Sequence, residues 1–588
     1  MKKIIMQDNG VVFYEENGVC IDINLDNQTD TIVFSPCDDS IKDIDLFSVD
    51  KTFPNIKKLI IMNGIENIFI SNHMFPNVRS VKSFNPRYIS GCTLKCYNDR
   101  AQICLLNSFC LNKDETLDIS YVDKICNFAL DGCQTRNLSN MKHPIRACEN
   151  QAFEGSAFHV QPEDNGICMC GNIVAGVDYQ MDDIVLPHKA LLLENIIDVS
   201  KIKKLTFTSI KDFFHSPVKI MPSHVCIMDI NASVNQLSRA ANRDGITDFY
   251  VHPNHPDCTT KDGVLFSKDM TKIIKCPSQK TGAYIVPDGV NEIMNFAFHD
   301  CENITSLVLP DSVTTLGTAC FQYCTGLKSI KFGNRITRIG LGIAIFSNCY
   351  ALEEVTIPKQ VREIGEGCFK FCDNLRNVYF EEGSQLRVLD KLAFYRCPLN
   401  YIELPESIYY IEDVSLVGTK EVKIPRKNRR QIMKAVTAYA ASNEEMRDFN
   451  YCKVWIDGEK NPFIIPQVMK YSRETQNFLN WYLDEQTLQQ AYRYANTPLL
   501  RVELAFVVYN LTKDEDAKKY LKKYGKTLAL RMIEIGENQK LKEVLELNIL
   551  TKAAIKAAIE KAAAVNNSVA QAYLLQMQQT EEKRTFVL

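Results

Sequence analysis

The sequence lacks long apolar runs and any strong excess of charge. No stretch reaches the about 18 apolar residues that a membrane-spanning helix needs. The opening segment Met1–Asp8 contains an apolar run of only three residues, which is far short of the roughly 7–15 in a secretory signal. Basic residues number 68 and acidic residues 71, so the formal net charge is −3. Nothing global attracts nucleic acid or an anionic membrane, and we expect a cytoplasmic protein with no membrane span.

Familiar catalytic motifs are missing as well. The chain has no phosphate-binding Gly-x-x-x-x-Gly-Lys loop, no Gly-x-Ser-x-Gly nucleophile turn and no His-Glu-x-x-His zinc motif. Its 9 histidines are scattered, without a repeated nucleophile nearby in the sequence. We therefore predict that the protein is not an enzyme and that it has no catalytic, cofactor-binding or metal-binding residues.

One phenylalanine recurs at a nearly constant spacing in the second half of the chain. The intervals between its copies are 23, 25, 23 and 25 residues, and a cysteine follows each copy by three residues. Leu416 takes the same position 22 residues after the last copy. A period of roughly 20–29 residues is typical of leucine-rich repeats, whose units must stack to bury their apolar faces. The copies are Phe298, Phe321, Phe346, Phe369 and Phe394, followed by Cys301, Cys324, Cys349, Cys372 and Cys397.

The same pattern continues in weaker form toward the N-terminus. Two units place equivalent residues 23 positions apart, namely Val122, Ile125, Leu130 and Cys133, then Ile145, Cys148, Phe153 and Ser156. A shorter echo links Phe53-Pro54-Asn55-Ile56 with Phe75-Pro76-Asn77-Val78. Each unit reads as a turn, a short strand, a tight bend and a second short strand. We predict an α/β leucine-rich-repeat solenoid that begins near the N-terminus, with the phenylalanines forming an internal ladder.

The repeat also explains most of the 22 cysteines. Five follow the ladder phenylalanines, and Cys320 and Cys368 take the small-residue position just before two of them. Free cysteine packs as a small buried hydrophobe, and disulfides are not expected in a reducing compartment. We predict packing roles for these seven thiols, so the two Cys-x-x-x-Cys pairs are by-products of the repeat.

Three other groups of residues carry weaker hints of metal chemistry. His252, His255 and Cys258 form a His-x-x-His-x-x-Cys string whose imidazole and thiolate groups suit zinc, but a structural role without a metal is the favoured interpretation. The remaining groups lack the paired spacing of zinc knuckles, and packed thiols are the favoured interpretation of both. They are Cys92, Cys96, Cys104 and Cys110, and the pair Cys168 and Cys170.

Two insertions interrupt the period. Residues 166–187 and 251–287 alternate apolar and polar residues around glycine turns, as in Asp262-Gly263-Val264-Leu265-Phe266. Both are predicted to form β-hairpins that project from, or extend, the sheet. Insertions on a repeat scaffold are candidates for a binding face.

The repeat pattern resembles a known family. The spacing Pro-x-x-Val-x-x-Ile-x-x-x-Ala-Phe-x-x-Cys-x-x-Leu, best seen over residues 250–425, is similar to the BspA-type leucine-rich repeats of bacterial and some protist proteins. The resemblance implies a right-handed solenoid that binds proteins or surfaces, often in host contact. Surface members of that family usually carry export signals, and this chain departs from them at its first residues.

The composition changes after Pro425. A basic run, Arg426 to Lys434, is predicted to mark a solvated helix face that closes the solenoid. From Asn461 onward helix-favouring residues dominate, and Gly525 and Gly536 are placed as helix C-caps. Asn496-Thr497-Pro498-Leu499 and the segment from Thr551 to Leu575 are similar to fragments of ankyrin repeats. We predict an all-α domain of helical hairpins.

These observations divide the chain into four expected segments. Residues 1–118 form degenerate N-terminal repeats and a cap, and residues 119–250 form divergent repeats with a hairpin insertion. Residues 251–460 form the BspA-type repeats and a closing segment, and residues 461–588 form the helical domain. The boundaries follow the loss of the period and the change in composition.

Three functions compete on this sequence. The favoured hypothesis is a non-catalytic scaffold that binds a protein partner through the solenoid surface and the inserted hairpins. A second is a cell-surface adhesin exported by an unrecognised route, as the family resemblance suggests. A third is a metal-binding sensor or an enzyme built around the cysteine-rich N-terminal half. The sequence identifies neither the partner nor an oligomeric state.

Overall fold

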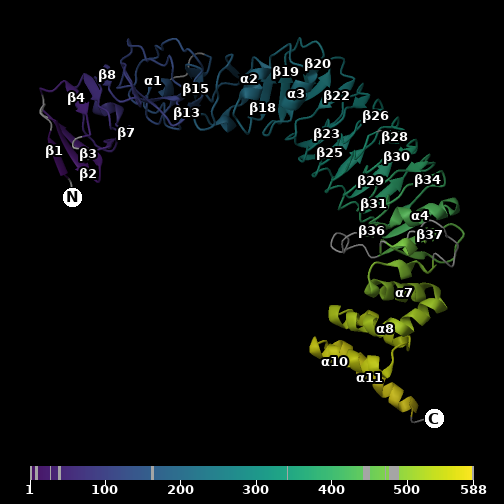
Figure 1. Ribbon diagram of the computed structural model, residues 1–588. Helices are drawn as coiled ribbons and strands as arrows, with labels where there is room; N and C mark the ends of the chain where they lie inside the picture. Colours follow the sequence, from purple (N-terminus) through teal and green to yellow (C-terminus); the bar gives the residue numbers. More distant parts are fainter. Residues whose placement is uncertain are drawn as a thin grey trace. The chain divides into compact units, whose positions relative to one another are not determined.

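The computed structural model describes residues 3–6, 11–26, 28–36, 41–160, 165–340, 342–440, 451–470, 472–475, 478 and 489–585. The chain divides into two compact units, residues 1–263 and 264–588, which we call unit 1 and unit 2. This division is coarser than the four expected segments. Figure 1 shows both units as successive layers of short strands, with helices at the C-terminal end.

Unit 1 starts with three sheets. The sheets contain, in order, β1 (Lys3–Met6), β2 (Val11–Glu16), β3 (Val19–Leu25), β5 (Asp43–Asp45) and β7 (Asn67–Phe69); β4 (Thr31–Phe34), β6 (Lys58–Ile61) and β8 (Ser80–Ser83); and β9 (Tyr88–Ile89), β10 (Leu94–Tyr97), β11 (Ile103–Asn107), β12 (Lys124–Ile125) and β13 (Ala147–Cys148). In the first sheet, β1, β2 and β3 pair antiparallel, and β3, β5 and β7 pair in parallel. The strands of the second sheet are parallel, and the third sheet has antiparallel pairs among β9, β10 and β11 and parallel pairs among β11, β12 and β13.

The rest of unit 1 contains the first hairpin and a short α/β section. Four parallel strands form one sheet, and two helices connect its last three strands. The elements are η2 (Asn72–Met74), α1 (Ala157–Val160), β14 (Ile167–Cys170), β15 (Ile173–Val177), β16 (Ile184–Leu186), η3 (Val199–Lys201), β17 (Lys204–Phe207), α2 (Ile210–His215), β18 (His224–Ile227), α3 (Val234–Ala241), β19 (Asp248–Val251) and β20 (Cys258–Lys261).

Unit 2 has two rows of strands, seen on opposite sides of the repeats in Figure 1. One row consists mainly of two-residue strands, and we call the other row the long-strand face. The first row is β21 (Val264–Ser267), β22 (Lys272–Lys275), β24 (Glu292–Ile293), β26 (Thr315–Leu316), β28 (Arg338–Ile339), β30 (Glu363–Ile364), β32 (Val388–Leu389) and β34 (Tyr410–Ile411). The long-strand face is β23 (Gly282–Ile285), β25 (Ile304–Val308), β27 (Ser329–Lys331), β29 (Glu354–Ile357), β31 (Asn377–Phe380), β33 (Ile402–Glu403), β35 (Glu421–Ile424), β37 (Tyr451–Ile456) and β38 (Phe463–Pro466).

The phenylalanine ladder runs through the core between these rows, as predicted. All five rings are fully buried. Successive ring centroids lie 5.0, 5.1, 5.3 and 5.2 Å apart from Phe298 to Phe394, and every pair is stacked. Each repeat therefore completes the apolar core of its neighbour, as stacking of short units requires.

The ladder cysteines are buried and also link successive repeats. Cys324 Sγ donates to the carbonyl oxygen of Phe298 at 3.2 Å, and Cys349 Sγ donates to that of Phe321 at 3.3 Å. Burial raises the pKa of both thiols well above the usual range, so they are protonated donors at neutral pH. The packing prediction is confirmed, and the hydrogen bonds add a role that the sequence did not indicate.

Both predicted hairpins form, and both extend the core. β14 pairs antiparallel with β15, and Cys168, Cys170 and Ile173 are buried there. The second insertion places β22 antiparallel to β21 and parallel to β24. Because Val264, Leu265 and Phe266 on β21 are fully buried, the apolar residues of this segment serve packing.

The strands continue beyond residue 461, so the helices begin later than the sequence indicated. β36 (Ala438–Ala440) pairs in parallel with β39 (Val468–Lys470). On β38, Ile465 belongs to the repeat core and Ile464 to the core of the helical region. β38 therefore contributes to both cores and joins the repeats to the helical region.

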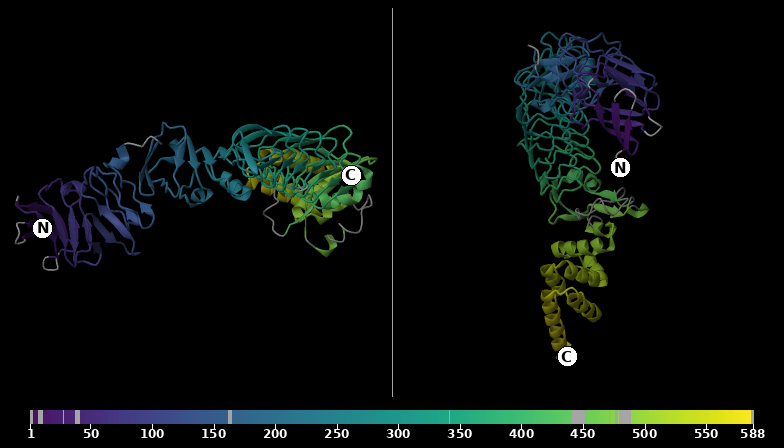
Figure 2. Two further views of the ribbon diagram at one scale, coloured as in Figure 1. Left: turned by 90° about the horizontal axis from the view of Figure 1, so that it is seen from above. Right: turned by 90° about the vertical axis from the view of Figure 1, so that its left-hand side faces the viewer.

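The C-terminal part forms helical hairpins, drawn in yellow in the right-hand view of Figure 2. Gly536 is the left-handed C-cap of α8 as predicted, but Gly525 is not a cap. It lies inside α8, where a Cβ would meet Leu550 Cδ2 at 3.1 Å, so close packing explains it. The elements are η4 (Arg426–Asn428), α4 (Arg429–Val436), η5 (Ala491–Tyr494), α7 (Pro498–Thr512), α8 (Glu515–Ile535), α9 (Asn538–Glu546), α10 (Lys552–Ala564) and α11 (Ser568–Thr585).

None of the described helices is both long enough and apolar enough to cross a membrane.

Candidate functional site

A groove follows the long-strand face of unit 2 across β31, β33 and β35. It encloses about 610 Å³, and a second hollow of about 380 Å³ adjoins it and shares Tyr401, Lys423 and Asp457. We call the two together the tyrosine groove. It is lined by Asn377, Val378, Tyr379, Phe380, Glu381, Gly383, Ser384, Tyr401, Glu403, Leu404, Pro405, Glu406, Glu421, Lys423, Trp455, Ile456, Asp457, Gly458 and Glu459.

Strand alternation places the aromatic side chains of this groove outward. On β31, Val378 is buried and Tyr379 is 52% exposed. On β33, Ile402 is buried, and Tyr401 just before this strand is 41% exposed. Successive side chains of a strand point to opposite faces, so the apolar residues hold the core and the tyrosines remain outside. Trp455 on β37 is half-buried at the same face.

Several polar groups of the groove are paired with each other. Lys423 Nζ donates to Glu403 Oε1 at 2.7 Å, and the Tyr401 hydroxyl donates to Glu403 Oε2 at 3.1 Å. The Lys423 hydrogen bond is the main cause that holds the pKa of Glu403 below its usual range. Trp455 Nε1 donates to Glu421 Oε1 at 2.5 Å. These contacts hold the aromatic rings in fixed positions, although exposed ion pairs of this kind contribute little stability.

The groove is acidic around its aromatic residues. The larger hollow is lined by the carboxylates of Glu381, Glu403, Glu406 and Asp457 and by one ammonium group, that of Lys423. No histidine or cysteine lines either hollow. The groove therefore offers aromatic contact and negative charge, and it holds no histidine- or cysteine-based nucleophile.

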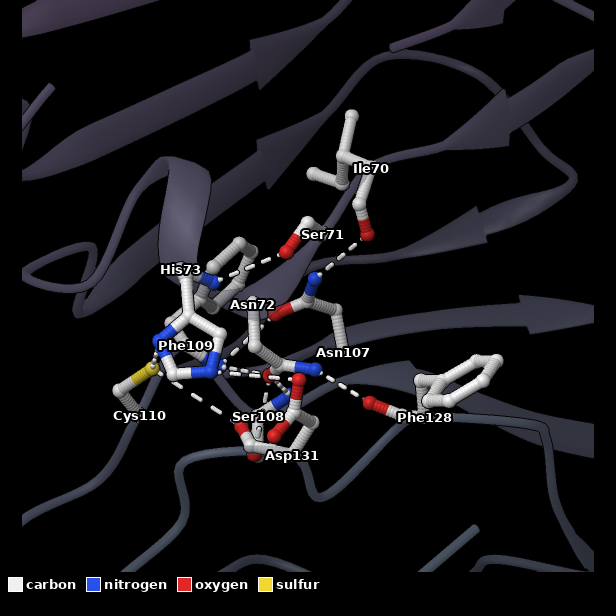
Figure 3. Close-up of polar contacts among 10 residues, drawn as sticks. All are labelled: Ile70, Ser71, Asn72, His73, Asn107, Ser108, Phe109, Cys110, Phe128 and Asp131. Atoms are coloured by element: carbon white, nitrogen blue, oxygen red, sulfur yellow. Dashed lines mark hydrogen bonds and ion pairs between the residues drawn. The ribbon is translucent and has the colours of Figure 1, made fainter. Parts of the chain in front are cut away.

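Unit 1 contains a second cluster of polar side chains, which Figure 3 shows in close-up. Cys110 Sγ lies 3.7 Å from Nδ1 of His73, and His73 Nε2 lies 3.2 Å from Asp131 Oδ2. His73 is on η2, whose N-terminus is capped by Ser71, and the other two residues are on connecting segments. The sequence did not predict this cluster.

Two buried asparagines hold the cluster in place. Asn72 Oδ1 accepts from the backbone N–H groups of Ser108 and Phe109, each at 2.9 Å, and Asn72 Nδ2 donates to the Phe128 carbonyl. Asn107 Nδ2 donates to the Ile70 carbonyl at 3.0 Å. Fully satisfied buried networks of this kind fix one geometry. The asparagines therefore fix the backbone just before Cys110 relative to the helix turn of His73.

The residues that the sequence offered as possible metal ligands are separated from each other or form other contacts. His255 is buried, with Nε2 2.8 Å from the Ala232 carbonyl oxygen and Nδ1 3.2 Å from Cys258 Sγ. His252 Nδ1 accepts from the Asn254 backbone at 3.0 Å. Across the part of the chain that the structure describes, no group of three or more His, Cys, Asp or Glu side chains is placed to hold a metal ion.

The remaining candidates fall into the core or pair locally. Cys96 and Cys104 face each other across β10 and β11 and are buried, whereas Cys92 is half-buried. The basic run forms η4 and α4 as predicted, and Arg429 lies 3.6 Å from Glu459. Ile432 and Met433 on α4 are buried, so one face of this helix is part of the repeat core.

Stacked turns of parallel strands, with a buried residue ladder between two rows, define a leucine-rich-repeat solenoid. Residues 287–423 match the family described as BspA type leucine rich repeat region in six copies, and this segment belongs to that family. No curated protein matches the chain.

Several solved structures are similar to the chain. A leucine-rich repeat protein from Eubacterium ventriosum has 14% identity and a TM-score of 0.28, over 75% of this chain and 97% of its own. The pneumococcal vaccine antigen PcpA has 16% identity and a TM-score of 0.28, over 78% and 94%. A leucine-rich repeat protein from Bacteroides capillosus has 25% identity and a TM-score of 0.19, over 21% and 99%.

Proposed function

We propose that this chain is a non-catalytic scaffold that binds a protein partner in the tyrosine groove. The observation that carries the proposal is the pair of exposed side chains, Tyr379 and Tyr401, on neighbouring repeats that line one hollow of about 610 Å³. Repeats of this family are typical of protein-interaction and surface proteins. Tyrosine and tryptophan dominate the binding energy of protein interfaces because they bury large area with few rotatable bonds.

The charge of the groove indicates the chemistry of the partner. Four carboxylates and one ammonium group line the larger hollow, and aromatic faces attract cations. A partner segment that carries both apolar side chains and Lys or Arg side chains is therefore complementary to the groove. Binding is expected to weaken as salt rises, because exposed charges are screened.

The test is a binding comparison between two matched double variants of the full chain. The double variant Tyr379→Ser, Tyr401→Ser lacks the aromatic pair of the groove. Its affinity for the protein partner that the unaltered chain binds should fall on the order of 10²-fold. The control is Tyr409→Ser with Tyr410→Ser at the opposite row, where both side chains are exposed and Tyr410 donates to Glu412 at 2.7 Å. Equal affinity of the two variants would contradict the proposal.

The location is proposed to be a reducing compartment such as the cytoplasm. The described cysteines are thiols, although many lie close together in the core, and oxidising compartments favour disulfides. Since repeats of this kind also occur in surface proteins, a cell-surface adhesin is the alternative. Labelling of the protein on intact cells by a membrane-impermeant thiol reagent would favour the adhesin and contradict the cytoplasmic location.

The helical region is proposed to be a cap, because Ile464 of β38 packs in its core. Its similarity to ankyrin repeats stays a prediction.

A further inference from the structure

The cluster in unit 1 has the order of groups that activates a nucleophile. A thiol, an imidazole and a carboxylate follow one another, with 3.7 Å from Cys110 Sγ to His73 Nδ1 and 3.2 Å from His73 Nε2 to Asp131 Oδ2 (Figure 3). The imidazole can take a proton from the thiol through one nitrogen while the carboxylate orients the ring through the other. Cys110 Sγ donates to the Asp131 carbonyl oxygen at 3.8 Å, so the thiol proton must turn to His73 for the attack. The distance from Sγ to Nδ1 is longer than a tight hydrogen bond, as is common before a substrate binds.

The backbone conformation at the thiol differs from that of the ladder repeats. Phe109 and Cys110 have φ angles of 55° and 51°, two adjacent residues in the left-handed region. In the ladder repeats the positive φ values lie four residues apart, as at Phe296 and Asp300. A left-handed conformation is unfavourable for residues with a side chain and persists only where the surroundings enforce it. The Asn72 and Asn107 hydrogen bonds to this segment supply that enforcement.

Gly132 leaves the space that the thiol and imidazole occupy. A Cβ there would lie 2.5 Å from Cys110 Sγ and 2.9 Å from His73 Cε1, and the φ of +72° already favours glycine. Equivalent turns of the ladder repeats carry side chains at this position, among them Asp300 and Tyr323 at φ 63° and 58°. The positive φ is thus a property of the repeat, whereas the missing side chain is required by the cluster.

The cluster is partly exposed, and its thiol is protonated. The His73 side chain is 59% exposed, and Cys110 is half-buried. Burial, followed by the charge of Asp131 and the neighbouring Cys133, raises the pKa of Cys110 to about 11, while Arg79 acts in the opposite direction. A protonated thiol is a weak nucleophile at neutral pH. It therefore needs a base that removes the proton during attack, and His73 is in the position to do so.

We propose that Cys110 is an acceptor thiol for acyl groups carried as thioesters, and that His73 takes its proton during the attack. The Cys110 sulfur forms a bond to the acyl carbon, and the bond from that carbon to the donor sulfur breaks. The proton held on His73 passes to the departing thiolate, so atoms and charge balance without a metal, an oxidant or a reductant. Asp131 acts as a positioning residue for the His73 ring. This modification site is independent of the tyrosine groove.

The test measures acylation of each cysteine in the full chain. S-acetyl-N-acetylcysteamine serves as the thioester probe, and peptide mass spectrometry gives the rate at Cys110 and at Cys92, which has the same intermediate exposure. General-base assistance predicts a rate at Cys110 on the order of 10²-fold above that at Cys92. Equal rates in the unaltered protein would overturn the proposal without any variant.

A substitution then separates proton transfer from structure. His73→Ala should lower the Cys110 rate to about the Cys92 rate, and added imidazole should restore part of it, which a merely structural role would not allow. An unchanged Cys110 rate in His73→Ala would also overturn the proposal. Labelling of the buried Cys170, which lies in the same unit as Cys110, reports unfolding of that unit. If the variant unfolds, the comparison of Cys110 with Cys92 in the unaltered protein decides.

Discussion

Replacing Phe346 with alanine should lower the free energy of unfolding of unit 2 by about 4 kcal/mol. The ring is fully buried and lies 5.1 Å from Phe321 and 5.3 Å from Phe369, with Phe332 edge-on at 5.8 Å. Its removal leaves a cavity between two repeats and ends both stacking contacts, and aromatic pairs add about 0.5–1.5 kcal/mol beyond the area they bury. Because the units stack in one dimension, the ladder is interrupted at its middle.

Urea denaturation of the full chain followed by circular dichroism measures this effect. Tyr409→Ala is the matched control, because that ring is 76% exposed and its loss should change stability by less than about 0.5 kcal/mol. If Phe346→Ala unfolded at the same urea concentration as the control, the ladder would not hold the repeats together.

Replacing Gly365 with alanine should cost about 3 kcal/mol, at the upper end for overpacking. An added Cβ would lie 2.4 Å from the Gly340 carbonyl oxygen and 2.7 Å from Gly340 Cα. Both atoms are backbone, so neither can rotate away. The φ of Gly365 lies outside the left-handed region, which means that alanine is intrinsically tolerated there and the loss comes from the close approach of two repeats.

Gly91→Ala provides the comparison for this substitution. A Cβ at Gly91 meets no heavy atom within 4 Å, so the substitution should be neutral or should stabilise by up to about 1 kcal/mol. Thermal unfolding of both variants is a direct check. Equal melting temperatures would contradict the close approach of the Gly340 and Gly365 backbones.

The repeat architecture could be predicted because its cause is periodic. A residue that must pack against its copy in the next unit recurs at the period of the fold, and Phe298 to Phe394 made that period visible. The same argument placed the ladder cysteines in the core. Their hydrogen bonds to carbonyls one repeat away, such as Cys397 Sγ to Phe369 at 2.9 Å, depend on thiol orientation, which spacing does not reveal.

The ends of the elements were less predictable. Gly525 resembles a cap in the sequence, yet α8 continues through it because Ile549 and Leu550 approach its backbone. Likewise, β38 and β39 follow the change in composition at residue 461. In both cases tertiary contacts override local preference.

The candidate sites had no periodic signal. Tyr379 and Tyr401 occupy outward positions, which the core does not constrain, and they meet only when two repeats stack. Cys110 is separated from His73 by 37 residues and from Asp131 by 21, across the weakest part of the repeat pattern. The spacing of Cys110 and Asp131 is close to one repeat, but the 37 residues between His73 and Cys110 match no whole number of repeats, so a search at the repeat period would have missed His73.

Site-specific photocrosslinking tests the binding proposal most directly. A photoreactive phenylalanine analogue at position 379 or at position 409 is irradiated in cells of the source organism, and the captured proteins are compared. Both positions are exposed tyrosines, on the long-strand face and in the opposite row respectively. We expect one discrete partner from position 379 that is missing from position 409 and from the Tyr401→Ser background. Capture of the same partner at both positions, or only at 409, would contradict it.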